Sequence, residues 1–201
     1  MNKILEKIKS FYKANSEIIT PTAVLAIICI VVTLALSSAN LLTYKKIDAL
    51  AKETQEKAMA KVMSGEYEEI TESIGDDEVT YNVVRNDGVV IGYIFTTSAK
   101  GYGGEILVMT AVKTDLTIAA VEILDASGET PGLGQNVTKA DWYKQFATRT
   151  NDISVVKSGA NSEKNEVDAV TGATISSKAV TSAVNQALDY AKEIMSKGAE
   201  S

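Results

Sequence analysis

The run VTYNVVRNDGVVIGYIFTT, residues 79–97, is the stretch that best indicates the fold. Its β-branched and aromatic residues are typical of strands, and Asn86-Asp87-Gly88 in its middle is typical of a tight turn. The run therefore predicts a hairpin with strands at 79–85 and 89–97. Two runs of the same kind follow at 105–112 and 117–124, and four strands in succession predict a mostly antiparallel sheet.

Helices are predicted after these strands. Residues 141–148 are typical of a short helix, and residues 153–156 are typical of another strand. Residues 176–195 predict a C-terminal amphipathic helix, because one face carries Ala179, Val180, Ala183, Ala187, Leu188 and Ala191. We therefore expect an α+β domain in which helices pack against a mostly antiparallel sheet.

On the N-terminal side, residues 18–44, IITPTAVLAIICIVVTLALSSANLLTY, carry no charge. This stretch is longer than the roughly 20 apolar residues that span a bilayer core, and it lacks the polar stripe of a soluble helix. We predict one transmembrane helix at 22–42. The alternative is a cleaved signal peptide, whose cleavage site would lie near Ser37, Ser38 and Ala39, although its apolar region would normally be only about 7–15 residues long.

Charges beside this span predict its orientation. Lys3, Lys7, Lys9 and Lys13 precede it, so the positive-inside rule places the N-terminus in the cytoplasm. Lys45 and Lys46 lie at its other end, but a long following domain crosses a membrane largely regardless of charge. We therefore expect a cytoplasmic N-terminus at 1–21, the transmembrane helix at 22–42, an amphipathic linker helix at 43–65 that is a stalk or a lid, and an extracytoplasmic domain at 66–201.

The composition excludes several kinds of site. The chain has 201 residues and a formal net charge of −6, whereas proteins that bind nucleic acid present a basic face. It has no histidine, and its one cysteine, Cys29, lies in the apolar run. Haem on a histidine, cysteine-ligated iron–sulfur clusters, zinc sites and a Ser-His-Asp triad are therefore excluded, and no metal site is expected. Redox chemistry would need an organic cofactor.

Three segments interrupt the strand and helix patterns and are rich in glycine or hydroxyl groups. In KGYGGE, residues 100–105, glycines allow close backbone approach and offer N–H groups to an anion. In ETPGLG, residues 129–134, proline and two glycines favour a rigid loop that suits a planar ligand. In DAVTGATISS, residues 168–177, a hydroxyl-rich loop enters the last helix, whose N-terminus would bind phosphate. Without a ligand, the first two segments would be turns and the third an N-cap.

Together, ETPGLG and DAVTGAT resemble the FMN-binding domain of the RnfG subunit family, a domain that also occurs in the C subunit of the sodium-pumping NADH:quinone oxidoreductase. The resemblance covers the whole chain, and the short length favours RnfG. In that family the last hydroxyl residue of the [Ser/Thr]-Gly-Ala-Thr motif is bonded to the phosphate of FMN. The resemblance therefore implies a covalent phosphoester at Thr174, with Ser176 standing where many relatives have threonine.

The resemblance also implies which residues surround the FMN. The expected contacts are Gly101, Tyr102, Gly103, Gly104, Glu129, Thr130, Gly132, Leu133, Gly134, Thr171, Gly172, Ala173 and Ser176. A Mg-dependent flavin transferase would move FMN from FAD onto Thr174, and it would recognise Asp168, Thr171, Gly172 and Ala173 together with Thr174. Tyr102, Trp142 and Tyr143 are candidates for stacking on the flavin, although aromatic residues more often lie in a core.

The function implied by the resemblance is electron transfer within a membrane complex that couples ferredoxin:NAD⁺ electron transfer to Na⁺ or H⁺ translocation. The chain has no NAD fingerprint and would not be active alone. Its partners would be the other integral and peripheral subunits of an Rnf-type complex, the flavin transferase during maturation, and membrane lipid. Two alternatives remain open, namely a membrane-anchored FMN-binding regulatory domain without pump activity, and a structural domain in which the three loops are turns and caps.

Overall fold

The structure is a computed structural model that describes residues 16–75, 77–150 and 152–198. The chain divides into two compact units, one ending at Lys52 and the other beginning at Glu53. The four lysines on which the predicted orientation depends, Lys3, Lys7, Lys9 and Lys13, lie outside the described residues.

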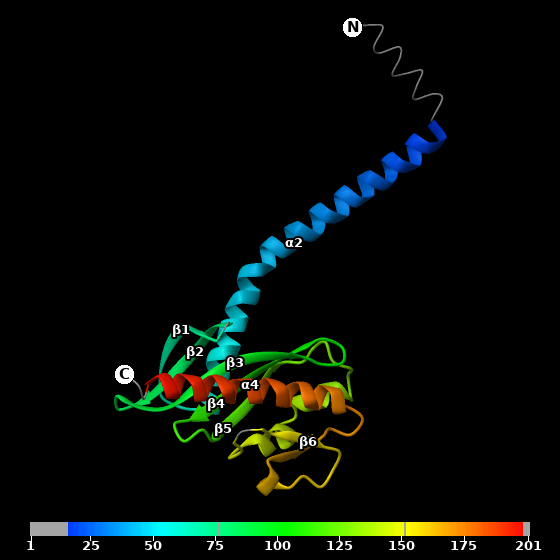
Figure 1. The fold of residues 1–201 in the computed structure, drawn as a ribbon. Coiled ribbons are helices and arrows are strands. Elements are labelled where there is room, and N and C mark those ends of the chain that lie inside the picture. Colours follow the sequence, from blue (N-terminus) through cyan, green and yellow to red (C-terminus); the bar gives the residue numbers. More distant parts are fainter. Residues whose placement is uncertain (1–15, 76, 151, 199–201) are drawn as a thin grey trace. The chain divides into compact units, whose positions relative to one another are not determined.

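Helix α2, Ser16–Val62, contains the predicted span (Figure 1). Its apolar part runs from Glu17 to Tyr44 and is 28 residues long, and a window of 18 residues within it has a mean hydropathy of 2.6. Its large apolar side chains are exposed, and the hydroxyl groups of Thr22, Thr33 and Ser38 each donate to a carbonyl four residues earlier. Because these polar groups are satisfied within the helix, the segment fits a single-pass membrane anchor.

The sheet has five antiparallel strands in the order β1-β2-β3-β4-β5. Their bounds are Glu66–Ile74, Asp77–Asn86, Val89–Lys100, Glu105–Lys113 and Ile118–Asp125. Asp87 and Gly88 both have positive φ, as a tight hairpin turn between β2 and β3 requires. The predicted hairpin and the two following strands are therefore confirmed, and β1 is an additional strand.

Strand β1 was not predicted, because its sequence, EYEEITESI, is rich in charged residues and only Ile74 is buried. It lies at the edge of the sheet and pairs with β2 alone. Charged side chains are common on such strands, because they oppose pairing with another chain. The charged residues that obscure β1 in the sequence are thus explained by its position at the edge of the sheet.

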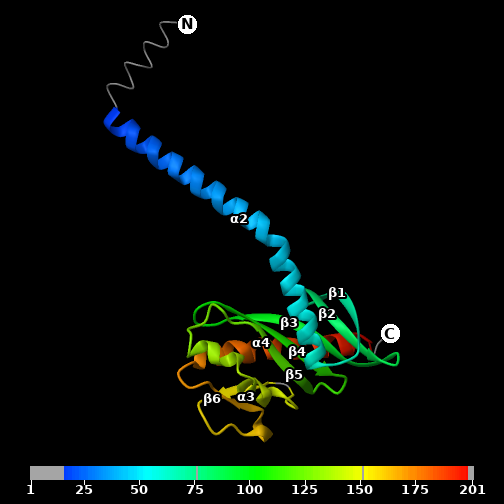
Figure 2. The same ribbon diagram turned by 180° about the vertical axis from the view of Figure 1, so that it is seen from behind.

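Helices cover both faces of this sheet within the second unit. Helix α4, Thr174–Gly198, packs on β3 and β4 (Figures 1 and 2). The last turns of α2 pack on the other face through Ala58 and Val62. Strand β4 shows the alternation, since Ile106 and Val108 face the α4 core while Met109 faces the α2 core.

The remaining elements lie between β5 and α4. Short helices occupy Gly134–Thr138, Ala140–Tyr143 (α3) and Lys144–Phe146, so the predicted helix at 141–148 is present as α3 and the turn after it. The predicted strand at 153–156 is β6, Ser154–Val156, and it pairs in parallel with β7, Glu166–Asp168. With α4 beginning two residues earlier than predicted, the α+β class is confirmed.

Thr110 offers a test of this packing. Its side chain is fully buried on β4, and its hydroxyl is the one buried side-chain polar atom without a hydrogen-bond partner among the described residues. Thr110→Val is therefore expected to raise the free energy of unfolding by about 1 kcal/mol. The matched control is Thr97→Val, which should lower it by about 1 kcal/mol because the Thr97 hydroxyl donates to the Ala183 carbonyl at 2.8 Å. Chemical denaturation of the full chain in detergent, followed by tryptophan fluorescence, would contradict the assignment if both changes had the same sign.

Candidate functional site

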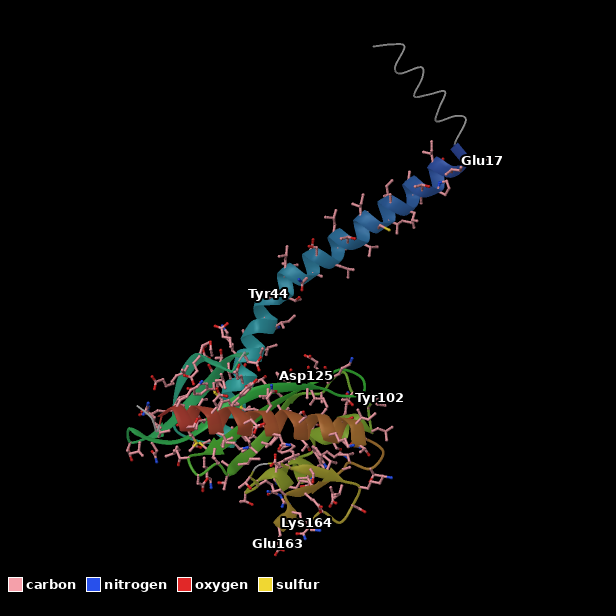
Figure 3. The ribbon with its side chains drawn as sticks, in the orientation of Figure 1. Glu17, Tyr44, Tyr102, Asp125, Glu163 and Lys164 are labelled. Atoms are coloured by element: carbon pink, nitrogen blue, oxygen red, sulfur yellow. The ribbon has the colours of Figure 1, made fainter. Side chains whose placement is uncertain are left out.

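The three glycine- and hydroxyl-rich segments meet at one cavity of about 580 Å³. One wall is the loop after β3, another is the loop after β5, and the third is the first turn of α4. Figure 3 shows Tyr102 projecting from the β3–β4 loop near the beginning of α4. The cavity is lined by Tyr102, Glu129, Thr130, Leu133, Gly134, Gly172, Ala173, Thr174, Ile175 and Ser176.

In the first segment, only Tyr102 lines the cavity, and the glycines serve packing. The Gly103 N–H donates to Glu129 Oε1 at 2.9 Å instead of facing the cavity. A Cβ on Gly103 would collide with the carbonyl oxygen of Gly128, and one on Gly101 would collide with the Glu129 carboxylate. The expected contacts from Gly101, Gly103 and Gly104 are therefore not among the lining residues, because these glycines let two loops approach each other.

The second segment is the rigid loop that its sequence predicts. The Leu133 N–H donates to the Thr130 carbonyl at 3.1 Å, and Gly132 between them has φ +77°. This is the geometry of a turn that requires glycine at its third position. Asn136 Nδ2 donates to the Gly132 carbonyl at 2.7 Å and holds the loop further. Thr130 and Leu133 thus face the cavity, whereas Gly132 does not line it.

Glu129 lies behind this loop with only 2% of its surface exposed. Ser176 Oγ donates to Glu129 Oε2 at 2.5 Å, and Gly103 donates to Oε1. Burial opposes ionisation of the carboxyl, but the Ser176 hydroxyl and the N–H groups of Gly103, Gly104 and Tyr102 outweigh it and hold its pKa below the usual value. A buried carboxylate therefore joins all three segments.

The third segment leads into the first turn of α4, where the hydrogen bonds of the hydroxyl groups decide whether the helix is capped. Ala173 holds the cap position, since its carbonyl accepts from the Ser177 N–H at 3.0 Å. The Ser177 hydroxyl donates to Ala173 O and accepts from Val170 N–H, and the Ser176 hydroxyl is bonded to Glu129. No side chain in this described turn therefore caps the helix, although serine and threonine are the preferred caps.

The hydroxyl of Thr174 stands apart from its neighbours. Within the part of the chain that the structure describes, this hydroxyl has no hydrogen-bond partner. The backbone N–H groups of Thr174, Ile175 and Ser176 also have no acceptor there. The first turn also contains no acidic residue. The positive end of α4 is therefore open toward the cavity, and a phosphate there would satisfy it. Thr171, by contrast, does not line the cavity.

Asp168 lies outside the cavity and is held by the protein. Its Oδ1 accepts from the Ala160 N–H at 2.9 Å, and its backbone carbonyl accepts from Trp142 Nε1 at 2.7 Å. Its backbone N–H donates to Gln145 Oε1 at 2.7 Å. This clamp fixes the start of the loop that leads to Thr174.

The three aromatic residues considered for stacking on the flavin, Tyr102, Trp142 and Tyr143, have different surroundings in the structure. The Trp142 ring packs on Phe146 with the centroids 5.5 Å apart, and Tyr143 is buried with its hydroxyl bonded to Glu122. Neither lines the cavity, so the suggestion that Trp142 or Tyr143 stacks on a ligand there is wrong. Both are needed for packing between α3 and its neighbours.

Ile175 is a cavity residue that was not predicted from the sequence, and its side chain is 54% exposed beside the opening. With Tyr102 at 72% and Leu133 at 47% exposure, it forms an apolar rim around the opening. The sequence does contain a pattern that could have identified Ile175, because this apolar residue lies outside the buried face of the last helix. Large exposed apolar side chains gathered at one cavity are typical of a ligand site. We find no group of three potential metal ligands in the described residues.

This arrangement suits a ligand with two different ends. A flat apolar portion would lie against the rim of Tyr102, Leu133 and Ile175. A phosphate would lie at the open end of α4 beside the Thr174 hydroxyl.

Comparisons with known proteins agree with this arrangement. Residues 101–189 match the family model described as an FMN-binding domain, and this range contains all the lining residues. The chain is 31% identical over 182 residues to the G subunit of the Na(+)-translocating ferredoxin:NAD(+) oxidoreductase complex of Acetobacterium woodii, covering 82% of this chain and 87% of that protein. It is 33% identical over 177 residues to the G subunit of the ion-translocating oxidoreductase complex of Methanosarcina acetivorans, covering 82% and 92%.

A solved structure shares the fold. The crystal structure of Shewanella oneidensis NqrC aligns with a TM-score of 0.55 and 24% identity, covering 65% of this chain and 70% of that one.

Proposed function

Because the chain belongs to the RnfG family, the G subunits of ion-translocating oxidoreductase complexes, and contains an FMN-binding domain, we propose that it carries one FMN joined by a phosphoester to Thr174 and transfers electrons within such a complex. The observation that supports this most is the first turn of α4. Its N–H groups lack acceptors, its cap residue is alanine, and the Thr174 hydroxyl is unpartnered among the described residues. An ester-linked phosphate would be bonded to the Thr174 oxygen, and its other oxygens would accept hydrogen bonds from the N–H groups that no side chain caps.

The lining residues fit the rest of the cofactor. Tyr102, Leu133 and Ile175 would contact the apolar ring and keep water from its face, while Gly172 and Ala173 bring the backbone close to the phosphate. When bound, the flavin supplies the redox chemistry, and the protein supplies its orientation and surroundings. Gly172 matters because it has φ +77° and because a Cβ there would lie 3.2 Å from Leu133 Cδ2.

Attachment would take place during maturation. A flavin transferase that recognises the motif from Asp168 to Thr174 would break the phosphoanhydride bond of FAD and form the bond from Thr174 Oγ to phosphorus. AMP leaves, and the hydroxyl loses its proton. A covalent bond would be useful if residues 66–201 lie outside the cell, because a dissociated cofactor would be lost there.

The membrane arrangement is part of the proposal. We propose that residues 22–42 cross the membrane, that residues 1–21 are cytoplasmic, and that the linker at 43–65 leads to the extracytoplasmic domain. The chain would then transfer electrons between other subunits of an Rnf-type complex. We propose ferredoxin:NAD⁺ electron transfer coupled to Na⁺ or H⁺ movement, since the Acetobacterium relative is named for the first ion and a Clostridium ljungdahlii relative, 40% identical over 100 residues, for protons.

Mass spectrometry tests the proposed attachment. The chain produced together with its transferase should gain the mass of one FMN less one water. Tryptic cleavage after Lys164 and Lys178 yields a peptide with four hydroxyl residues, Thr171, Thr174, Ser176 and Ser177. Fragmentation should place the increment on Thr174 alone. An unmodified chain, or an increment on one of the other three residues, would overturn the proposal.

A further inference from the structure

We propose that Glu129 is the positioning residue of this site, in that its carboxylate fixes the β3–β4 loop to helix α4 and so sets the walls between which the flavin ring lies. The identity of the ligand rests on the proposed function. The contacts of the carboxylate do not, because they are made with this chain's own residues.

The two oxygens of Glu129 bridge elements that are far apart in sequence. Oε1 accepts from the Gly103 N–H at 2.9 Å, 26 residues earlier, and Oε2 accepts from the Ser176 hydroxyl, 47 residues later. Each oxygen thus has a donor from the protein. Glu129 therefore acts on a ligand through the loops that it holds, although its side chain lies in the cavity wall.

The surrounding glycines show that the site is built around this side chain. A Cβ at Gly101 would collide with Oε1, and a Cβ at Gly134 would collide with Oε2. Only residues without a side chain allow these two loops to close on the carboxylate. Tyr102 and Leu133, the two loop residues of the apolar rim, are each next to one of these glycines. Glu129 thereby fixes the backbone from which both rim side chains project.

The negative charge of Glu129 is stabilised by the dipoles of nearby hydroxyl and N–H groups. Its hydrogen-bond partners are the Ser176 hydroxyl and the Gly103 N–H, and the N–H groups of Gly104 and Tyr102 also favour the charged form. No lysine or arginine among the described residues forms an ion pair with it. The positive end of α4 lies on the Ser176 side. Because hydrogen bonds to the charged form hold the pKa below its ordinary value of 4.5, the carboxylate is ionised at neutral pH.

A covalent cofactor allows attachment and placement to be measured separately. We would compare Glu129→Ala, Glu129→Gln and a control, Glu105→Ala, in the full chain matured with its transferase. Glu105 is exposed and follows the same loop. Intact mass reports attachment, and the fluorescence anisotropy of the attached flavin reports whether its ring is held. Glu129→Ala should lower the anisotropy at least twofold, and Glu105→Ala should leave it unchanged.

Glutamine should rescue most of this loss. Its carbonyl oxygen can accept from the Gly103 N–H, and its amide can donate to the Ser176 hydroxyl, which can reorient. The pH profile separates the carboxylate from the amide. The folded-state pKa of Glu129 is depressed, so its contribution is present above pH 4.5 and is lost as the pH falls through the lower folded pKa. The wild-type anisotropy should fall in that acidic range only to the value of Glu129→Gln, because a protonated carboxyl has the same one acceptor and one donor, and the Glu129→Gln anisotropy should not change with pH.

Hydrogen exchange tests the same residue without any flavin. In the unmodified chain, Glu129→Ala should speed exchange of the Gly103 amide about tenfold, while amides in β4 should keep their wild-type rates. Equal exchange at Gly103, or an attached flavin with wild-type anisotropy in Glu129→Ala, would overturn the proposal. A wild-type chain that never gains flavin would sink the proposed function instead, and the exchange result would still decide the role of Glu129.

Discussion

Replacement of Thr174 by alanine is expected to abolish covalent flavin attachment, whereas Thr174→Ser should retain it. The physical reason is that the hydroxyl of Thr174 alone lies at the open end of α4 with no partner in the described structure, and alanine removes the oxygen that would form the ester. Serine keeps that oxygen at the same backbone position. Denaturing electrophoresis with in-gel flavin fluorescence measures the result, because only a covalently bound flavin remains with the chain.

The control for this experiment is Ser182→Ala. Ser182 is exposed on the same helix, two turns after Thr174, and its loss should leave the fluorescent band unchanged. A fluorescent band from Thr174→Ala would show that another hydroxyl carries the flavin. In that case the unsatisfied first turn of α4 would need a different explanation.

The largest stability effect is expected at Phe95. Its side chain is fully buried beneath α4, and its ring packs on Tyr81 with centroids 5.4 Å apart and on Tyr190 of α4 with centroids 6.2 Å apart. Phe95→Ala should lower the free energy of unfolding by about 3–5 kcal/mol, because it removes apolar contacts and leaves a cavity. Such a loss is a large part of the total stability of a typical domain, about 5–15 kcal/mol.

The matched control is Val89→Ala on the same strand. Val89 is 66% exposed, so its truncation should change the free energy of unfolding by no more than about 0.5 kcal/mol. Chemical denaturation of the full chain, followed by the fluorescence of Trp142, measures both variants. Equal midpoints for the two would mean that Phe95 is not part of the core between the sheet and α4.

The sequence predicts those elements whose residues repeat with a clear period. The hairpin of β2 and β3 and helix α4 were predicted because a turn or an apolar face marks each of them. Strand β1 was missed because an edge strand needs little apolar surface, and β7 because only one of its three residues, Val167, is β-branched. The predicted linker belongs to the same helix as the apolar segment, and this helix continues up to Val62 because no residue between the two parts stops it.

The site was predicted as three segments, but the role of each residue was not. Glycine and hydroxyl content locates loops where backbone and ligand come close, and the three loops do share one cavity. It does not reveal that the Gly103 N–H is bonded to Glu129, or that Trp142 is bonded to Asp168. Those facts depend on contacts between residues far apart in the chain, which no local pattern contains.

The acidic edge strand bears on how two copies of this chain would meet. Glu66, Glu68 and Glu72 occupy β1, where a second molecule would otherwise add its own strand. Two such edges brought together would repel each other. We therefore expect separate copies of the protein to resist association through this edge.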